Sequence, residues 1–188
     1  MVDHCPVCGS RDIRMRPILW PELIAEWRLE PHEVEYVDRQ QGQHCGECFC
    51  NVRSMVLAVS VMRAFRFAGL FQDFVLEPAA RELAVLEINE AGALTHFFAR
   101  LPGRHLACHP QVDMMNLPYD ENRFDLVIHS DTLEHVADPV RGLSECRRVL
   151  KTGGLCVFTV PIVVGRMTIS RTGMPPSYHG DPSVDRRA

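Results

Sequence analysis

The chain has 188 residues, of which 46% are hydrophobic and 23% are charged, and its net charge is −4. This composition is ordinary for a folded globular protein and excludes a disordered or fibrous chain. The acidic balance also excludes a general electrostatic attraction to nucleic acid or to an anionic membrane. The apolar runs are too short for a membrane span, and the opening MVDHCPVCGS lacks the apolar core of a secretory signal. We therefore expect a cytoplasmic protein without a membrane partner.

Two cysteine pairs form the pattern C-x2-C-x36-C-x2-C near the start of the chain. The four residues are Cys5, Cys8, Cys45 and Cys48. Each C-x2-C turn can aim two thiolates at one ion, and two turns complete a tetrahedral four-thiolate zinc site. Gly9 and Gly46 suit the tight turns around the sulfurs, and loop-closure entropy grows slowly enough to allow the long insert. We predict structural zinc, because four thiolates leave no open position for catalysis. Buried free thiols are the alternative.

The other cysteines and the insert between the two pairs have simpler interpretations. Cys50 lies close to the second pair and is an alternative ligand, whereas three later cysteines are expected to be small core residues. These three are Cys108, Cys146 and Cys156. The insert contains both tryptophans, and four of its residues are spaced to form one helical face. They are Trp20, Leu23, Ile24 and Trp27. Packing against the rest of the protein is favoured for this face over a role as a lid or substrate platform.

The remaining chain divides by its hydrophobic pattern. Residues 1–50 hold the cysteine pairs and the insert. Residues 51–80 form a connecting helix, with apolar residues at 52, 55, 56, 59, 62 and 65 and an end near Gly69 and Pro78. Residues 81–161 alternate between strands and helices, and residues 162–188 form an irregular tail rich in Gly, Pro, Ser and Arg.

Four apolar segments after residue 82 predict strands: LAVLEI, HLAC, FDLVIHS and LCVFTVP. One helix is expected over about 92–101 and another over 138–154. Asp138 is a plausible N-cap for the second helix, Pro139 fits its first turn, and Gly153 is a plausible stop. Alternation of strands and helices predicts an α/β fold with a parallel sheet, in which ligands bind beyond the carboxyl ends of the strands.

The segments VLEINEAGAL and LPYDENRFDLVIHSDTLEHVADPVRGLSECRRVLKTGGLCVFTVP together resemble the class I S-adenosylmethionine-dependent methyltransferases. The resemblance covers about Leu83 to Pro161. The cysteine pairs followed by NVRS also resemble a subgroup with an N-terminal zinc-binding segment. The resemblance implies a Rossmann-like sheet of order 3-2-1-4-5. The residues after Pro161 do not offer the family's last two strands, so we expect an exposed edge strand that could join two copies of the chain.

The same resemblance implies an S-adenosylmethionine site around the first strand. Glu87 would act at the methionine amino group of the cofactor, directly or through the loop. Asn89 and Gly92 belong to the cofactor loop, where Asn89 and Ala91 stand at positions that usually hold glycine. Asn89 tolerates positive φ better than most residues.

Further along, the resemblance implies that Asp113 and Met114 contact the adenine. His129 and Ser130 would lie nearest the cofactor at the end of a later strand. The acidic residue that usually holds the ribose is replaced by Cys108-His109-Pro110.

Residues after that strand supply the candidates for catalysis. Glu134 and His135 would face the cleft or cap the following turn, and His135 is the candidate catalytic base, although a structural histidine is the commoner case. His179 is a second candidate if the tail covers the cleft.

The resulting hypothesis is methyl transfer from S-adenosylmethionine to a small-molecule or glycan acceptor. An RNA methyltransferase that grips its substrate with the zinc segment is an alternative. Residues 1–76 carry 8 basic and 10 acidic side chains, which disfavours that alternative. A third reading is a catalytically impaired methyltransferase-like scaffold, because the loop has lost glycines and the ribose acid is missing.

Overall fold

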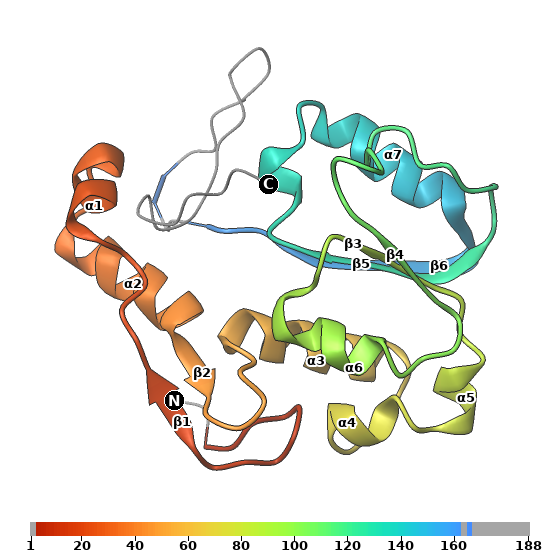
Figure 1. Cartoon of the computed structure of the whole chain (residues 1–188), viewed down its shortest axis with the longest axis horizontal. Helices are drawn as coiled ribbons and strands as arrows, with labels where there is room; N and C mark the ends of the chain where they lie inside the picture. The colour runs from red at the N-terminus through yellow and green to blue at the C-terminus, as the bar shows by residue number, and fades with distance from the viewer. Residues whose placement is uncertain (1–2, 163–164, 167–188) are drawn as a thin grey trace.

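The structure is a computed structural model that describes residues 3–162 and 165–166. Its centre is a four-stranded sheet with helices on both faces, and a small cysteine-bearing segment lies beside it (Figure 1). The helix α7, Pro139–Val149, covers one face of the sheet. The helices α3, Val52–Ala64, and α6, Thr95–Phe98, cover the other. This three-layer arrangement confirms the expected α/β class.

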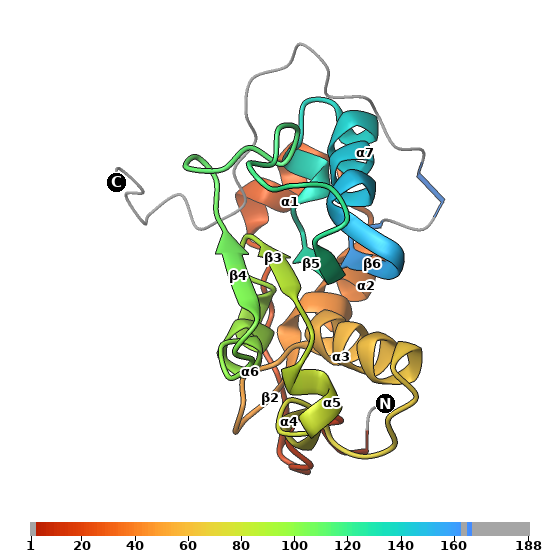
Figure 2. The same cartoon turned by 90° about the vertical axis from the view of Figure 1, so that its right-hand side faces the viewer.

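The sheet is parallel throughout and has the order β4-β3-β5-β6 (Figure 2). The strands are β3, Val85–Ile88; β4, Arg104–Ala107; β5, Phe124–Ser130; and β6, Leu150–Thr159. This order matches the 2-1-4-5 part of the expected sheet, but the described residues contain no strand for the remaining position. Residues 108–123 connect β4 to β5 without a helix or strand. Within the described chain β6 is an edge strand, and an association of two copies through it stays a prediction.

The start of α7 agrees with the sequence analysis, but its end does not. The Asp138 side chain accepts a hydrogen bond from the Arg141 backbone N–H at 3.0 Å, and a proline occupies the first turn. The helix ends at Val149, so the expected stop at Gly153 is wrong. Leu150 already pairs with β5, and Gly153, at φ +82°, lies inside β6. The helix ends before Gly153 because Leu150 already pairs with β5 in the sheet.

The connecting region is helical, as expected, but it is broken into pieces. After α3 come α4, Phe71–Phe74, and α5, Pro78–Arg81. Pro78 therefore begins a helix and does not end one, because a proline at the first turn has no N–H to leave unbonded. The helix expected over about 92–101 is a 3-10 turn, η1, Gly92–Leu94, followed by the single turn of α6. No helix in the described residues is long and apolar enough to cross a membrane.

The cysteine-bearing segment combines a small ribbon with two helices. The strands β1, Ile13–Met15, and β2, Gln43–Cys45, pair antiparallel. Between them lie α1, Pro21–Trp27, and α2, Pro31–Gly42. On the expected face of α1, Leu23 is buried, and its three companions Trp20, Ile24 and Trp27 are half-buried.

An arginine that follows the sheet contacts these two helices. The Arg166 guanidinium donates to the backbone oxygens of Trp27 and Arg28 and pairs with the buried Glu33 carboxylate. This ion pair lowers the pKa of Glu33 to about 2. The helical insert is therefore held from two ends, by the ribbon and by the chain beyond β6.

One hydrophobic core joins the cysteine-bearing segment to the sheet. Its buried members come from the cysteine turns, from α3, from the loop after β3 and from β5. They include Cys5, Val7, Cys45, Cys50, Met55, Ala58, Ala91, Leu94, Leu126 and Ile128. A second core lies between the sheet and α7. The boundaries expected at residues 50, 80 and 161 stay predictions.

Candidate functional site

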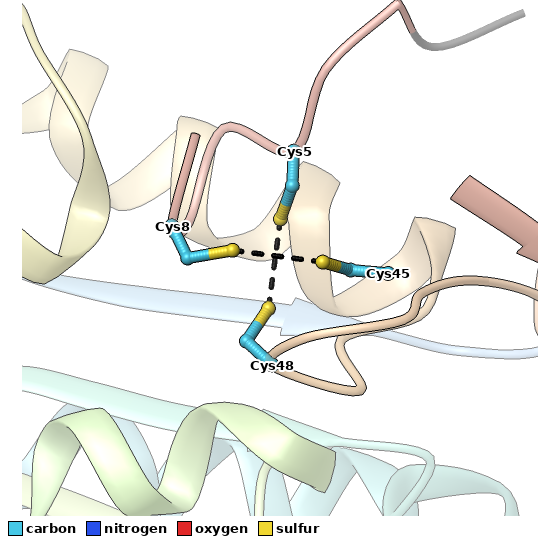
Figure 3. A group of neighbouring side chains, drawn as sticks. All are labelled: Cys5, Cys8, Cys45 and Cys48. Carbon is cyan, nitrogen blue, oxygen red and sulfur yellow. Dashed lines mark hydrogen bonds between the residues drawn. The ribbon is translucent and has the colours of Figure 1, made fainter. Parts of the chain in front are cut away.

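The four paired cysteines meet at one point, with their sulfur atoms directed toward a common centre (Figure 3). All four Sγ atoms lie within 4.8 Å of one another, with Cys5 to Cys48 at 3.6 Å and Cys8 to Cys45 at 3.5 Å. Zinc–sulfur bonds of roughly 2.3 Å place tetrahedral sulfurs about 3.8 Å apart. The hydrogen bond with Cys48 and burial raise the pKa of the Cys5 thiol, and a bound cation would reverse that shift. The donor set therefore fits a tetrahedral zinc ion.

The two cysteine turns share one backbone design. The Gly9 N–H donates to the Cys5 oxygen at 2.8 Å, and the Phe49 N–H donates to the Cys45 oxygen at 3.0 Å. Gly9 and Phe49 both have positive φ, +81° and +59°. The expected role of Gly46 as a turn glycine is therefore taken by Phe49. Gly46 is needed for a different reason, since a Cβ there would lie 2.1 Å from a carboxylate oxygen of Asp12.

The other cysteines differ in their burial. Cys50 is fully buried in the core next to the cysteine cluster, and Cys146 lies on the buried side of α7 in the second core. Cys108 and Cys156 are only half-buried, so the expectation that all three later cysteines are core residues holds for Cys146 alone.

A second candidate site lies at the carboxyl edge of the sheet, where the loops after β3 and β5 emerge. Glu87 is the next-to-last residue of β3, and its side chain is fully buried on the α3 face. One carboxylate oxygen accepts the Ala91 N–H at 2.8 Å, and the other accepts the Arg104 Nε–H at 2.6 Å. Glu87 therefore holds the loop after β3 through the Ala91 backbone, and Arg104 neutralises the charge of Glu87.

The loop that Glu87 holds contains two left-handed residues. Asn89 has φ +53° and Gly92 has φ +56°. The Asn89 side chain accepts the His109 N–H at 3.0 Å and donates to the Thr132 hydroxyl at 3.3 Å. A Cβ on Gly92 would lie 3.0 Å from the Ser54 hydroxyl. Asn89 thus takes the positive φ that the sequence analysis allowed and also ties the loop after β3 to the loop after β5.

The loop after β5 carries charges in a partly buried setting. Asp131 has φ +49° and forms an ion pair with Arg53 of α3. Burial raises the pKa of Asp131. Burial also raises the pKa of Glu134 to about 7, and the neighbouring negative charge of Asp131 adds to that shift. The His135 Nε2 atom lies 3.9 Å from a Glu134 oxygen, so protonation of His135 would favour the ionised carboxylate.

Polar atoms without partners gather at this same loop. Within the described residues, every buried side-chain nitrogen or oxygen that lacks a hydrogen bond belongs to Arg53, His129 or Glu134. His129 is the next-to-last residue of β5, Glu134 follows the strand, and Arg53 reaches the strand end from α3. Buried polar groups are normally satisfied, and unsatisfied ones commonly mark a site for water, an ion or a ligand. The carboxyl end of β5 therefore has the character of a binding site.

The predicted cofactor residues divide into two groups. Five of the seven lie on the carboxyl ends or loops of the adjacent strands β3 and β5, where Ile88 pairs with His129. They are Glu87, Asn89, Gly92, His129 and Ser130. The His129 ring is fully buried and stacks on Phe158 with centroids 4.7 Å apart. The Ser130 hydroxyl lies 2.7 Å from the Thr159 hydroxyl.

Asp113 and Met114 lie in the connection between β4 and β5. The Asp113 carboxylate accepts the Met115 N–H at 2.8 Å. Met114 is 4% exposed and packs in the second core, close to Gly142 of α7. Roles for these residues in binding, and for His135 in catalysis, stay predictions. His179 lies outside the described residues.

Two arginines that the sequence analysis missed are central to the site. Arg104 begins β4 and pairs with Glu87, while Arg53 lies in the first turn of α3 and pairs with Asp131. Both pairs join residues far apart in the chain, so spacing could not reveal them. The sequence signal that could have identified Arg53 is a charged residue within the mainly apolar helical segment VRSMVLAVSV. In the structure Arg53 is only 9% exposed.

Curated relatives of the chain are methyltransferases. A ubiquinone biosynthesis O-methyltransferase of Klebsiella pneumoniae is 27% identical over 179 residues, which are 92% of this chain and 63% of that protein. A demethylmenaquinone methyltransferase of Staphylococcus epidermidis is 30% identical over 147 residues, which are 77% of this chain and 53% of that protein. The chain thus spans between about half and two thirds of the length of these relatives.

A solved structure and a family model complete the comparison. The structure of the trans-methyltransferase CalH with S-adenosylhomocysteine aligns with a TM-score of 0.34 and 15% identity, over 72% of this chain and 43% of that one. Such a low score carries no structural argument. The family model of a methyltransferase domain matches residues 76–158, the part that holds the sheet and its two loops. Residues 76–158 are therefore similar to methyltransferase domains, in agreement with the resemblance seen in the sequence.

Proposed function

We propose that the protein is an S-adenosylmethionine-dependent methyltransferase that acts on a small-molecule acceptor. The observation that carries the proposal is the gathering of unpartnered buried polar atoms at the carboxyl end of β5, beside the loop that Glu87 holds. Ligands of open parallel sheets bind at this edge. The family match supplies the chemistry, since residues 76–158 contain both loops.

The chain's own residues would hold the cofactor around the loop after β3. Left-handed φ at Asn89 and Gly92 turns the backbone sharply at the strand end. Glu87 fixes that turn by accepting a hydrogen bond from the Ala91 N–H, and His129 and Ser130 end the neighbouring strand. When bound, S-adenosylmethionine supplies an electrophilic methyl group, so the protein's main task is to align an acceptor with it.

The acceptor class follows from charge and from the relatives. The two curated relatives above are named for quinone biosynthesis or a quinone substrate, which supports a small acceptor over RNA. A glycan acceptor remains within the proposal. If the acceptor is a hydroxyl group, a base must take its proton, and Glu134 and His135 in the loop after β5 are our candidates for that base.

We also propose that the four cysteines hold a structural zinc ion. Their distances and their shared place in the core support this role. A metal assay on the purified protein is expected to find about one zinc per chain. A Cys45→Ser variant is expected to lose the metal and much of its stability, because metal binding at such sites is coupled to folding. Full stability without metal would contradict the proposal.

Calorimetric titration with S-adenosylhomocysteine tests the cofactor site. We expect saturable binding to the zinc-loaded protein, and we expect the Glu35→Gln variant to bind equally well, since Glu35 is exposed on α2. Absence of detectable binding by a folded, zinc-loaded sample would contradict the proposal that the protein is a methyltransferase. Binding of a generic single-stranded RNA that weakens steeply with salt would favour the RNA alternative.

A further inference from the structure

The first turn of α3 connects the cysteine cluster to the carboxyl edge of the sheet. Asn51 directly follows the buried Cys50, and its side chain caps the helix by accepting the Ser54 N–H at 2.9 Å. The Cys45 N–H donates to the Cys50 oxygen at 2.9 Å, so the second cysteine turn closes on the residue before the cap. The position of the start of α3 is therefore set by the cysteine turn.

Two neighbouring residues of that turn reach the two loops of the site. Arg53 pairs with Asp131 in the loop after β5. Ser54 is buried with its hydroxyl 3.0 Å from the place of a Cβ on Gly92, in the loop after β3. The two loops are also joined by the hydrogen bond between Asn89 and Thr132. A shift of the first turn of α3 would therefore be felt in both loops.

The Arg53 ion pair is costly to bury, and each of its charges depends on the other. The side chain of Arg53 is 10% exposed and that of Asp131 is 30% exposed. Burial lowers the pKa of Arg53 and raises that of Asp131, so each charge depends on the other. Asp131 is also a non-glycine residue at φ +49°, a backbone state that costs energy unless its surroundings hold it.

Arg53 is also the cation that faces the other charged groups of this loop. The carboxylates of Asp131 and Glu134 both interact with Arg53, and His135 lies next to Glu134. The Nε atom of Arg53 has no hydrogen-bond partner within residues 3–162 and 165–166, which leaves a donor at the edge where the ligand would bind. Removal of Arg53 would leave two neighbouring carboxylates without a counter-ion.

We propose that Arg53 is a positioning residue of the methyl-transfer site, which holds the loop after β5 in place and links it to the metal site through α3. The inference rests on the proposed function, since it assigns a role around the proposed cofactor site. Its consequence is energetic coupling between the two sites. Zinc retention strengthens cofactor binding, and by reciprocity cofactor binding strengthens zinc binding, which we expect to appear as slower zinc release.

The first experiment measures the affinity for S-adenosylhomocysteine by calorimetry, with zinc content and thermal unfolding recorded for every sample. Arg53→Ala is expected to keep one zinc per chain and to bind about tenfold or more weakly. Arg53→Lys is expected to recover part of the loss. The matched control is Arg63→Ala, an exposed arginine in the last turn of α3, which is expected to bind like the wild type.

If Arg53→Ala does not fold, the neutral double variant Arg53→Gln with Asp131→Asn removes both charges and leaves neither one buried alone. Weaker binding by that folded variant supports the role of the pair. Unchanged binding by either folded variant overturns the inference while leaving the proposed function standing. Absence of binding by the wild type is a different outcome, since it removes the proposed function itself.

The second experiment measures coupling directly. The rate of zinc release to the chelator 4-(2-pyridylazo)resorcinol is recorded with and without saturating S-adenosylhomocysteine. We expect the ligand to slow release severalfold in the wild type and to have little effect in Arg53→Ala at ligand concentrations that still saturate it. A purely structural role for Arg53 would change the rate in both conditions alike. Equal release from the wild type with and without ligand would overturn the coupling.

Discussion

The loop after β3 and the loop after β5 leave adjacent strands at the same edge of the sheet, and each is associated with a partly or fully buried glutamate. Glu87 lies in β3 just before the first loop, and Glu134 lies in the second loop. Both oxygens of Glu87 accept hydrogen bonds, one from Ala91 and one from Arg104. Neither oxygen of Glu134 has a hydrogen-bond partner in the described part of the chain. The loop after β3 is therefore the complete loop, because both carboxylate oxygens of the glutamate that holds it are hydrogen-bonded, and it gives the site a fixed support. The loop after β5 is the incomplete loop, because its buried carboxylate lacks hydrogen bonds, as expected of a place that receives a ligand.

The largest loss of stability is expected from a substitution that removes the hydrogen bonds of Glu87, which hold the complete loop. Glu87→Ala leaves the Arg104 guanidinium largely buried without its partner and frees the Ala91 N–H. Removal of one member of such a pair costs about 3–5 kcal/mol. Urea unfolding of the variant should show this loss. The matched control is Glu35→Ala, an exposed pair member on α2, which should change stability by less than about 1 kcal/mol. Equal stability of the two variants would contradict the role of Glu87 in holding the loop after β3.

A substitution of Glu134 in the incomplete loop should raise the stability of the protein instead of lowering it. Burial raises the pKa of Glu134 from about 4.5 to about 7, so the folded state binds its proton more tightly than the unfolded state. Stability from this group is therefore fully present below the unfolded value and is lost as pH rises through about 7. Glu134→Gln removes the cost of the buried charge. It should stabilise the protein by about 1–3 kcal/mol at pH 8.

The difference between variant and wild type should shrink toward zero as the pH falls toward 5. Urea unfolding at several pH values measures it, and metal effects that are common to both proteins cancel in that difference. A gain that does not depend on pH would mean that Glu134 acts through packing and not through its charge. The charges facing it are those of Arg53, Asp131 and, when protonated, His135.

The sequence predicted the strands better than it predicted the contacts that complete them. A strand that carries Glu87 near its end follows from the apolar run VLEI and the turn residues after it. The expected α3 was also found, but the apolar positions that marked it coincide with its buried face only in part, since Met55 and Met62 are buried and the others are not. Val56 is 54% exposed, whereas Arg53 and Ser54 are buried. The helix packs against the cysteine turns and the sheet together, and a local pattern cannot include both partners.

The two glutamates illustrate the same limit. Both are acidic residues near strand ends, and nothing local separates their environments. Their difference depends on Arg104 of β4, which reaches Glu87, and on Arg53 of α3, which pairs with Asp131 instead of hydrogen bonding to Glu134. The cysteine cluster was predictable because the ligands of each turn are close in the chain and zinc chemistry fixes the rest. The ion pairs were not, because each joins separate elements.

A smaller effect is expected at the point where α3 meets the loop after β3. Gly92→Ala places a Cβ at φ +56°, 3.0 Å from the Ser54 hydroxyl. We expect a cost of about 1–2 kcal/mol for the left-handed backbone, plus a contribution from the contact. Gly153→Ala is the matched control, since Gly153 also has positive φ, but nothing within 4 Å meets a Cβ there. The excess loss at Gly92, measured by urea unfolding, should fall when Ser54 is changed to glycine as well.

The smallest effect is expected from the link between the two loops. Asn89→Gly keeps the left-handed turn and removes the hydrogen bonds to His109 and Thr132. Water can replace the exposed bond to His109, so the loss of stability should be about 0.5–1 kcal/mol. Affinity for S-adenosylhomocysteine should fall more than stability, because the complete loop would no longer hold the incomplete one beside it. If affinity and stability change in step, the hydrogen bond between Asn89 and Thr132 does not set the relative positions of the two loops, and α3 alone aligns them.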